Sequence, residues 1–173
     1  MAVAAAPYEG VFRRAVLELK FRRREVLGRA VGRVVAEAFL IADRSEDLGT
    51  AGPPPAATVA MPLPRRRQLR RGFNQAELIA RPVARSLAVP LARRVLTRRW
   101  RPSQTTLSRS RRRRSPAGSF RVRAGRLPAR LRGKPLLLVD DVVTTGSTVE
   151  AAVRCLRSAG AGPVDVATFA RTL

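Results

Sequence analysis

The sequence predicts an α/β protein built on a mainly parallel sheet that is flanked by helices. Residues 136–139 are wholly apolar and lie between Pro135 and two aspartates, which is typical of a strand buried on both faces, although so short a run is also compatible with a helix. A small polar loop, residues 144–148, then leads into apolar residues at helical spacing up to Gly160. Pro135 before these apolar residues and the polar loop after them favour a strand over a helix.

Periodicity and turn residues predict the remaining elements. Helical spacing indicates helices over residues 10–21 and 25–41, and Asn74 or its neighbours should cap a helix that extends to about Leu87. Pro82 falls inside this last helix and predicts a kink or an early stop near Ala80. Strands are expected over residues 56–61, 94–98, 133–141 and 162–170.

A length of 173 residues with 45% hydrophobic content predicts one compact domain, residues 1–173, whose oligomeric state stays open. Residues 1–7 lack the basic start of a secretory signal and predict a disordered terminus, whereas residues 99–131 show no period and predict a flexible loop region. No apolar run approaches the roughly 18 to 20 residues that span a bilayer. We therefore expect a cytoplasmic protein without a membrane partner.

The polar loop has the chemistry of a phosphate site. It would lie at a helix N-terminus, where backbone N–H groups lack intrahelical partners, and Gly146 lets the backbone approach an anion closely. Hydroxyl donors come from Thr144, Thr145, Ser147 and Thr148. Asp140 and Asp141 precede the loop, and their carboxylates suit a vicinal diol or a hydrated Mg²⁺. A diol beside a phosphate describes a ribose 5-phosphate.

Two other interpretations of this segment are weaker. An ordinary strand-to-helix turn with a Ser or Thr N-cap explains Ser147 but not two aspartates and three more small polar residues. A P-loop requires Gly-Lys-[Ser/Thr], and no lysine lies between Lys20 and Lys134.

Residues 135–148 closely resemble the phosphoribosyl pyrophosphate (PRPP) signature of type I phosphoribosyltransferases. The resemblance implies that family's Rossmann-like fold and a ligand that is PRPP or a related ribose phosphate. By the same resemblance, Asp140 and Asp141 are the catalytic carboxylates that hold the ribose hydroxyls and reach Mg²⁺ directly or through water. Residues 144–148 would hold the 5-phosphate.

A second resemblance covers nearly the whole chain and is to the ComF (competence protein F) family. Its landmarks occur here in the same order and spacing: Tyr8-Glu9-Gly10, Leu19-Lys20-Phe21, Met61-Pro62-Leu63-Pro64, Arg71-Gly72-Phe73-Asn74-Gln75, Gln104, Leu107-Ser108, Arg112 and Phe120. The resemblance to the PRPP enzymes further implies that a turn after an early strand wraps the pyrophosphate, with candidates Pro62, Leu63, Pro64 and Arg65. Arg71 and Arg112 are further candidates for the pyrophosphate, and Arg112 lies in the segment from Gln104 to Arg114 where the superfamily's closing loop would fall.

This chain departs from the ComF pattern in two places. Many relatives begin with a four-cysteine zinc module, but one cysteine and no histidine cannot assemble a zinc site here. Ser115-Pro116 replaces a frequent asparagine. In addition, Thr144 stands where phosphoribosyltransferases of 6-oxopurines commonly carry an acidic residue, so the acceptor nitrogen stays unknown and a 6-oxopurine is disfavoured.

The charge of +23 makes nucleic acid, in particular single-stranded DNA, a candidate partner. No acidic residue occurs between Leu78 and Val139, and Arg111 to Arg114 would be the first residues to test. However, 33 of the 35 cationic residues are arginine, and a genome biased toward GC-rich codons produces the same excess without any role in nucleic-acid binding. The few aromatic residues are scattered, so the sequence shows no surface on which the bases of a single strand could stack. Two functions therefore stay open: a phosphoribosyltransferase, or a non-catalytic protein of the same fold that acts in natural competence and DNA uptake.

Overall fold

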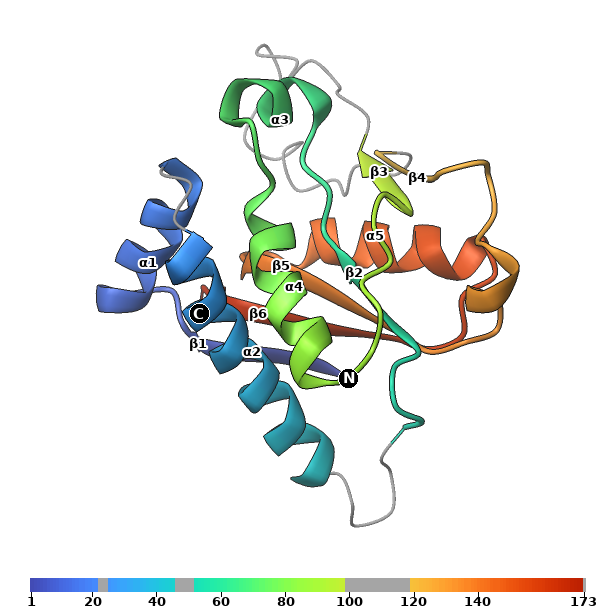
Figure 1. The fold of residues 1–173 in the computed structure, drawn as a ribbon, viewed down its shortest axis with the longest axis horizontal. Helices are drawn as coiled ribbons and strands as arrows, with labels where there is room; N and C mark the ends of the chain where they lie inside the picture. Colours follow the sequence, from blue (N-terminus) through green and yellow to red (C-terminus); the bar gives the residue numbers. More distant parts are fainter. Residues whose placement is uncertain (22–24, 46–51, 99–118, 173) are drawn as a thin grey trace.

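The computed structural model describes residues 1–21, 25–45, 52–98 and 119–172 (Figure 1). Its main sheet is formed by four parallel strands in the order β1-β6-β5-β2. These strands are β1 (Ala2–Pro7), β6 (Val164–Arg171), β5 (Leu136–Val143) and β2 (Ala57–Ala60). A separate antiparallel pair is formed by β3 (Leu96–Arg98) and β4 (Phe120–Val122). The predicted α/β class with a mainly parallel sheet is confirmed.

Helices cover both faces of the main sheet (Figure 1). One face packs against α1 (Gly10–Phe21), α2 (Glu25–Ser45) and α4 (Gln75–Ser86). The other packs against α5 (Ser147–Ser158), the β3–β4 pair and the 3-10 helix η3 (Ala129–Leu131). The short helix α3 (Arg65–Arg71) follows β2 and contains no buried residue.

Strand β5 is buried on both faces, as its sequence predicts. Leu136 and Leu138 belong to the core on the α5 side, whereas Leu137 and Val139 belong to the core beneath α2 and α4. All four side chains are fully buried. The strand continues two residues beyond the predicted end at Asp141, so both aspartates lie inside it. The core of the sheet thus fixes the backbone that carries them.

The N-terminal residues are ordered, and the prediction of a disordered terminus over residues 1–7 is wrong. They form edge strand β1, which pairs in parallel with β6, for example Ala2 with Val166. The N-terminal ammonium of Met1 also forms an ion pair of 2.5 Å with Asp165. The partner strand lies more than 160 residues further along the chain, so the local sequence carries no signal of the pairing.

Helix α4 continues through Pro82 to Ser86, so the predicted early stop near Ala80 is wrong. Pro82 removes the N–H that would bond the Leu78 carbonyl, which costs about 3 kcal/mol in a helix interior. Burial against α2 offsets this cost: Pro82 is buried, and a Cβ added to Gly32 would lie only 2.1 Å from Pro82 Cγ. The glycine on α2 is what allows the proline ring to pack there.

The predicted flexible region over residues 99–131 is only partly within the described chain. Residues 119–131 include β4 and η3, so this part has regular structure and the prediction is wrong for it. Residues 99–118 lie outside the described residues. Among the helices that the structure describes, none is long and apolar enough to cross a bilayer.

Candidate functional site

A cavity of about 220 Å³ opens at the carboxyl ends of β5 and β2. Because the sheet is parallel, the segments that follow these two strands meet at this edge. Residues 140–146 with Thr148 and Val149 form one wall, which we call the carboxylate wall. Arg67, Arg71 and Arg98 also line the cavity, and together they form what we call the arginine wall.

The carboxylate wall begins with two buried aspartates. Asp140 is 8% exposed and Asp141 is 5% exposed. Asp140 Oδ1 accepts a hydrogen bond of 2.8 Å from the backbone N–H of Asp141. Asp141 Oδ2 forms an ion pair with Lys20 Nζ, 3.1 Å away. This contact does not have the geometry of a hydrogen bond, and the oxygen accepts no hydrogen bond from the described residues. The pair therefore presents an oxygen with unused bonding capacity.

Burial raises the pKa of Asp140 well above its ordinary value, and the neighbouring charge of Asp141 raises it further. The Asp141 backbone N–H and the ammonium of Lys20 act in the opposite direction. Two adjacent carboxylates held out of water repel each other, so positive charge or hydrogen-bond donors brought to them lower the free energy of the ionised pair. The site is thus suited to a ligand that carries hydroxyl groups or a cation.

The loop after β5 leads directly into α5. Gly146 is the N-cap of this helix with φ 75°, a left-handed conformation that glycine adopts without strain. Neither Ser147 nor a threonine caps the helix, since Ser147 is its first residue and Thr145 Oγ1 lies 3.0 Å from Ser147 Oγ. The N–H groups of the first turn and the threonine hydroxyls lie beside the cavity, where they suit an anion.

Side-chain contacts hold two arginines of the arginine wall. Arg71 Nη1 donates a hydrogen bond of 3.2 Å to Oε1 of the buried Gln75. Arg98 Cζ lies 5.2 Å from the centroid of the Phe120 ring. Burial lowers the pKa of both guanidinium groups, and the charge of Arg67 lowers both further. Three cations that repel one another at one wall form a strong site for a multiply charged anion.

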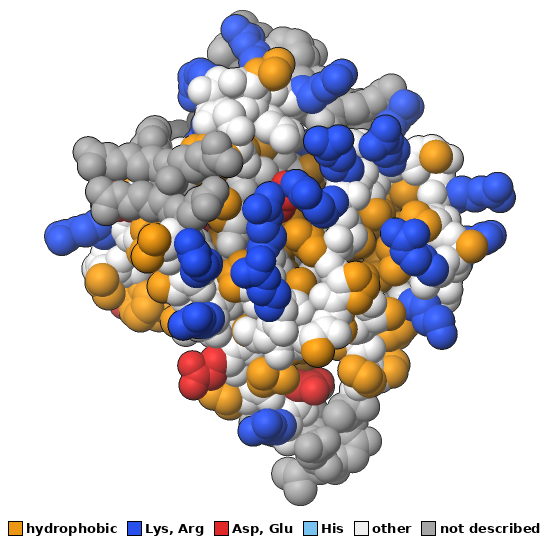
Figure 2. Space-filling model, viewed as in Figure 1, with side chains coloured by type: hydrophobic (Ala, Val, Ile, Leu, Met, Phe, Trp, Pro, Cys, Tyr) orange, Lys and Arg blue, Asp and Glu red, His pale blue; other side chains and the backbone are white. Residues whose placement is uncertain are grey.

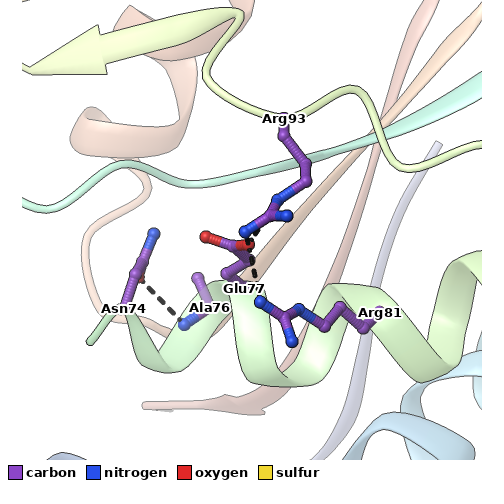
Figure 3. Close-up of polar contacts among 5 residues, drawn as sticks. All are labelled: Asn74, Ala76, Glu77, Arg81 and Arg93. Atoms are coloured by element: carbon purple, nitrogen blue, oxygen red, sulfur yellow. Dashed lines mark hydrogen bonds and ion pairs between the residues drawn. The ribbon is translucent and has the colours of Figure 1, made fainter.

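Asn74 is the N-cap residue of helix α4 (Figure 3). Its Oδ1 accepts the N–H of Ala76 at 3.1 Å and so caps α4, as predicted. Its Nδ2 donates to the Met61 carbonyl at 2.9 Å, which ties the end of β2 to the same helix. Further along α4, Glu77 Oε1 accepts from Arg81 and Arg93, so α4 is also tied to the segment before β3.

The structure brings most of the predicted site residues together. The predicted residues that line the cavity are Asp140, Asp141, Thr144, Thr145, Gly146, Thr148, Pro62, Leu63 and Arg71. Ser147, Pro64 and Arg65 adjoin it without lining it, and Arg65 is exposed at the start of α3. Arg112, like Arg111 to Arg114 as a whole, lies outside the described residues.

Four charged or polar cavity residues were not predicted to belong to the site: Lys20, Arg67, Gln75 and Arg98. Lys20 and Gln75 occur in motifs that carry the ComF resemblance, which is a signal that could have identified them. Arg98 reaches the cavity because its strand forms a bridge with Pro64, a contact between distant segments that the sequence does not show.

The donor set fits a magnesium ion only in part. Among the described residues, no group of three or more His, Cys, Asp or Glu side chains could hold a metal. The two carboxylates, including the buried Asp141 Oδ2, are oxygen ligands of the kind that Mg²⁺ takes. Further ligands would come from water and from the substrate itself, as is usual for Mg²⁺ bound with phosphates.

Positive charge outweighs negative charge on the face shown in Figure 2, where Lys and Arg side chains are more frequent than acidic ones. Five of the seven residues of α3 are arginine, and the helix has no acidic residue in its first turn.

Comparisons with known proteins agree with this geometry. Residues 74–172 match the model of the phosphoribosyl transferase domain family. The chain is 37% identical over 172 residues to the DNA utilization protein YhgH of Salmonella typhi, a match that covers 99% of this chain and 72% of that protein. It is 31% identical over 157 residues to Competence protein F of Haemophilus influenzae, covering 90% of this chain and 66% of the relative.

Among solved structures, a purine phosphoribosyltransferase from Pyrococcus horikoshii Ot3 overlaps with a TM-score of 0.48 and 15% identity, over 82% of this chain and 70% of that one. This overlap is weak, and the assignment does not depend on it. The domain match, which covers more than half of the chain, and the two relatives settle the family. The chain belongs to the phosphoribosyl transferase domain family, in the ComF group that includes Competence protein F.

Proposed function

We propose that this protein binds PRPP or a closely related ribose 5-phosphate together with Mg²⁺, and transfers the phosphoribosyl group to a nitrogen acceptor. One observation carries the proposal: the buried aspartate pair, the hydroxyl loop at the N-terminus of α5 and three arginines line a single cavity. These are the groups needed for a diol, a monophosphate and a pyrophosphate, respectively.

Each wall would bind one part of the ligand. Asp140 and Asp141 would accept hydrogen bonds from the 2- and 3-hydroxyls of the ribose, and the loop from Thr144 to Thr148 would hold the 5-phosphate. Arg67, Arg71 and Arg98 would bind the pyrophosphate, because each planar guanidinium group can donate hydrogen bonds to two phosphate oxygens at once. When bound, Mg²⁺ supplies charge neutralisation at the pyrophosphate and ribose oxygens.

The reaction is a substitution at the anomeric carbon. The bond from this carbon to the pyrophosphate oxygen breaks, the pyrophosphate keeps the electron pair, and the acceptor nitrogen forms the new bond and loses a proton to solvent. Positive charge develops on the sugar in the transition state, beside the two aspartates, while negative charge develops on the leaving group beside the arginines. The chain would thus contribute mainly positioning and charge stabilisation.

Calorimetric titration of PRPP tests this proposal. We expect metal-dependent binding by the wild type, and loss of that binding in Asp140→Asn, which keeps the shape and the Oδ1 acceptor but removes the charge. Glu37→Gln, an exposed carboxylate on α2, is the matched control and should bind as the wild type does. Absence of PRPP binding by the folded wild type with Mg²⁺ would overturn the proposal.

A second candidate function is binding of single-stranded DNA, which the exposed helix α3 favours. This helix buries no residue, although its arginines repel one another at i, i+3 and i, i+4 spacing. A segment whose repulsion is not offset by burial is well suited to a polyanion. Leu69, which is 83% exposed, adds an apolar contact that an unpaired base could meet. Two relatives are named for DNA utilization and competence, which agrees with this candidate.

The salt dependence of DNA binding tests the second candidate. Arg66→Gln with Arg70→Gln changes two arginines that do not line the cavity, and should reduce the salt slope by about 1.4 if both contact phosphates of a single strand. The control is Arg126→Gln with Arg130→Gln, two exposed arginines that precede β5 at the opposite edge of the sheet. Equal losses in both pairs would mean that only the overall charge attracts DNA.

A further inference from the structure

Helix α1 brings a lysine to the aspartate pair. Lys20 Nζ lies 3.1 Å from Asp141 Oδ2, and the lysine side chain lines the cavity. Its side chain is 25% exposed, whereas that of Asp141 is 7% exposed. The contact therefore joins a buried carboxylate to a cation that retains access to the open cavity.

The position of Lys20 is fixed by packing on the sheet. Val16 and Leu19 of the same helix are fully buried in the core that also contains Val139. Phe12 packs edge-on against Phe169 of β6, with the ring centroids 5.7 Å apart. Lys20 lies in the last turn of α1, where the helix dipole favours a cation. The ammonium is thus presented to the site by an anchored helix.

The ammonium lies beside Asp141 Oδ2, an oxygen of the kind that would bind a divalent cation. Asp141 Oδ2 is buried and accepts no hydrogen bond from the described residues, so its negative charge is balanced at short range by Lys20. In the part of the chain that the structure describes, no third His, Cys, Asp or Glu joins the two aspartates to form a metal site. A divalent cation that arrives without a sugar phosphate would have to displace the lysine ammonium, and the described residues would offer it only two carboxylate ligands.

Lysine suits this role better than arginine. Its ammonium is a compact charge on a flexible stem, whereas an arginine fork would hold the carboxylate through two parallel hydrogen bonds. The chain contains only two lysines, Lys20 and Lys134, against 33 arginines. One of these two rare side chains contacts Asp141, and it can swing into the open cavity when another cation arrives.

We infer that Lys20 acts as an internal cation at the aspartate pair in the ligand-free protein, so that a divalent metal ion enters only together with the phosphorylated sugar. The joint entry of metal ion and sugar rests on the proposed function, whereas the role of Lys20 in the ligand-free protein does not. Lys20 is here a positioning residue: it sets the order in which metal and sugar bind.

The test is titration of Mn²⁺, as a spectroscopic probe for Mg²⁺, in the absence of any sugar phosphate. The fraction of free Mn²⁺ is followed by electron paramagnetic resonance. Wild type and Lys134→Met, the matched lysine control, should bind Mn²⁺ weakly and equally. Lys20→Met should bind it at least about tenfold more tightly, because an unpaired buried carboxylate attracts the ion and no ammonium competes with it. Adding Asp141→Asn to Lys20→Met should abolish the gain.

Two outcomes would overturn the inference: tight Mn²⁺ binding by the wild type, or no gain in a folded Lys20→Met protein. Circular dichroism checks the fold, and Lys20→Gln serves as a second neutral variant if the methionine variant is unstable. A second titration adds PRPP. A wild type that fails to bind PRPP would refute the proposed function. The comparison of Mn²⁺ binding between Lys20→Met and wild type would still test the role of Lys20 in the ligand-free protein.

Discussion

The two walls of the cavity are built in different ways. On the carboxylate wall, Asp140 and Asp141 are buried residues of the central strand β5, and the loop after them enters a packed helix. On the arginine wall, Arg67 and Arg71 belong to a helix with no buried residue, and Arg71 is held by Gln75. Substitutions on the first wall should therefore alter stability and binding together, whereas those on the second should alter mainly binding.

A combined loss of stability and binding is expected from a substitution at Gly146. An alanine there would be strained at φ 75°, at a cost of about 1 kcal/mol or slightly more. Gly125 provides a matched control, since its φ is 76° and a Cβ would meet nothing within 4 Å. Both Gly→Ala variants should lose similar stability in urea denaturation, but only Gly146→Ala should weaken PRPP binding, by at least about tenfold. Equal binding by the two variants would show that the loop does not hold the phosphate.

Gln75→Leu addresses the arginine wall. It removes the acceptor of the Arg71 hydrogen bond from a buried position while nearly preserving volume, so PRPP affinity should fall about tenfold with little change in the unfolding temperature. Gln68→Leu, on the exposed surface of α3, is the control. If the Gln75→Leu protein instead unfolds at a markedly lower temperature, substitutions at the arginine wall also alter stability and the two walls do not differ in this respect.

Asp140→Asn should stabilise the ligand-free protein by a few degrees at neutral pH while it removes PRPP binding. Burial and Asp141 raise the pKa of Asp140 above its ordinary value of 3.8. The contribution of this carboxyl group to the free energy of unfolding is therefore full below pH 3.8 and is lost as the pH rises through the raised pKa. The advantage of the variant over wild type should therefore grow with pH above 3.8. Thermal denaturation across this range checks it, and a pH-independent difference would contradict it.

The smallest effect is expected from Arg70→Gln on α3. Arg70 repels Arg67 and Arg66 at helical spacing, and its charge contributes to the lowered pKa of Arg71. Relief of these repulsions should raise the free energy of unfolding by a few tenths of a kcal/mol at low salt, and the gain should vanish at high salt. Urea denaturation at two salt concentrations measures this. A gain that persists at high salt would have another cause.

The sequence predicted the carboxylate wall well because its residues are contiguous. The strand, both aspartates and the loop lie within residues 135–148, and each residue type has a local chemical meaning there. The other contributions come from distant segments. Lys20 and Arg98 reach the cavity through tertiary packing, and β1 is a strand only because β6 lies beside it. Neither relation leaves a periodic signal in the local sequence.

The close approach of α4 to Gly32 on α2 restricts position 32 to glycine during sequence change. Alanine at position 32 would collide with the proline ring, and alanine at position 82 would restore a helical N–H but leave a gap against α2. Replacing Pro82 would not by itself make room at position 32, because the added Cβ would also lie 2.6 Å from the backbone oxygen of Ile79. Among related sequences, glycine should therefore persist at position 32 whichever residue stands at position 82, and an engineer who replaces Pro82 should leave Gly32 unchanged.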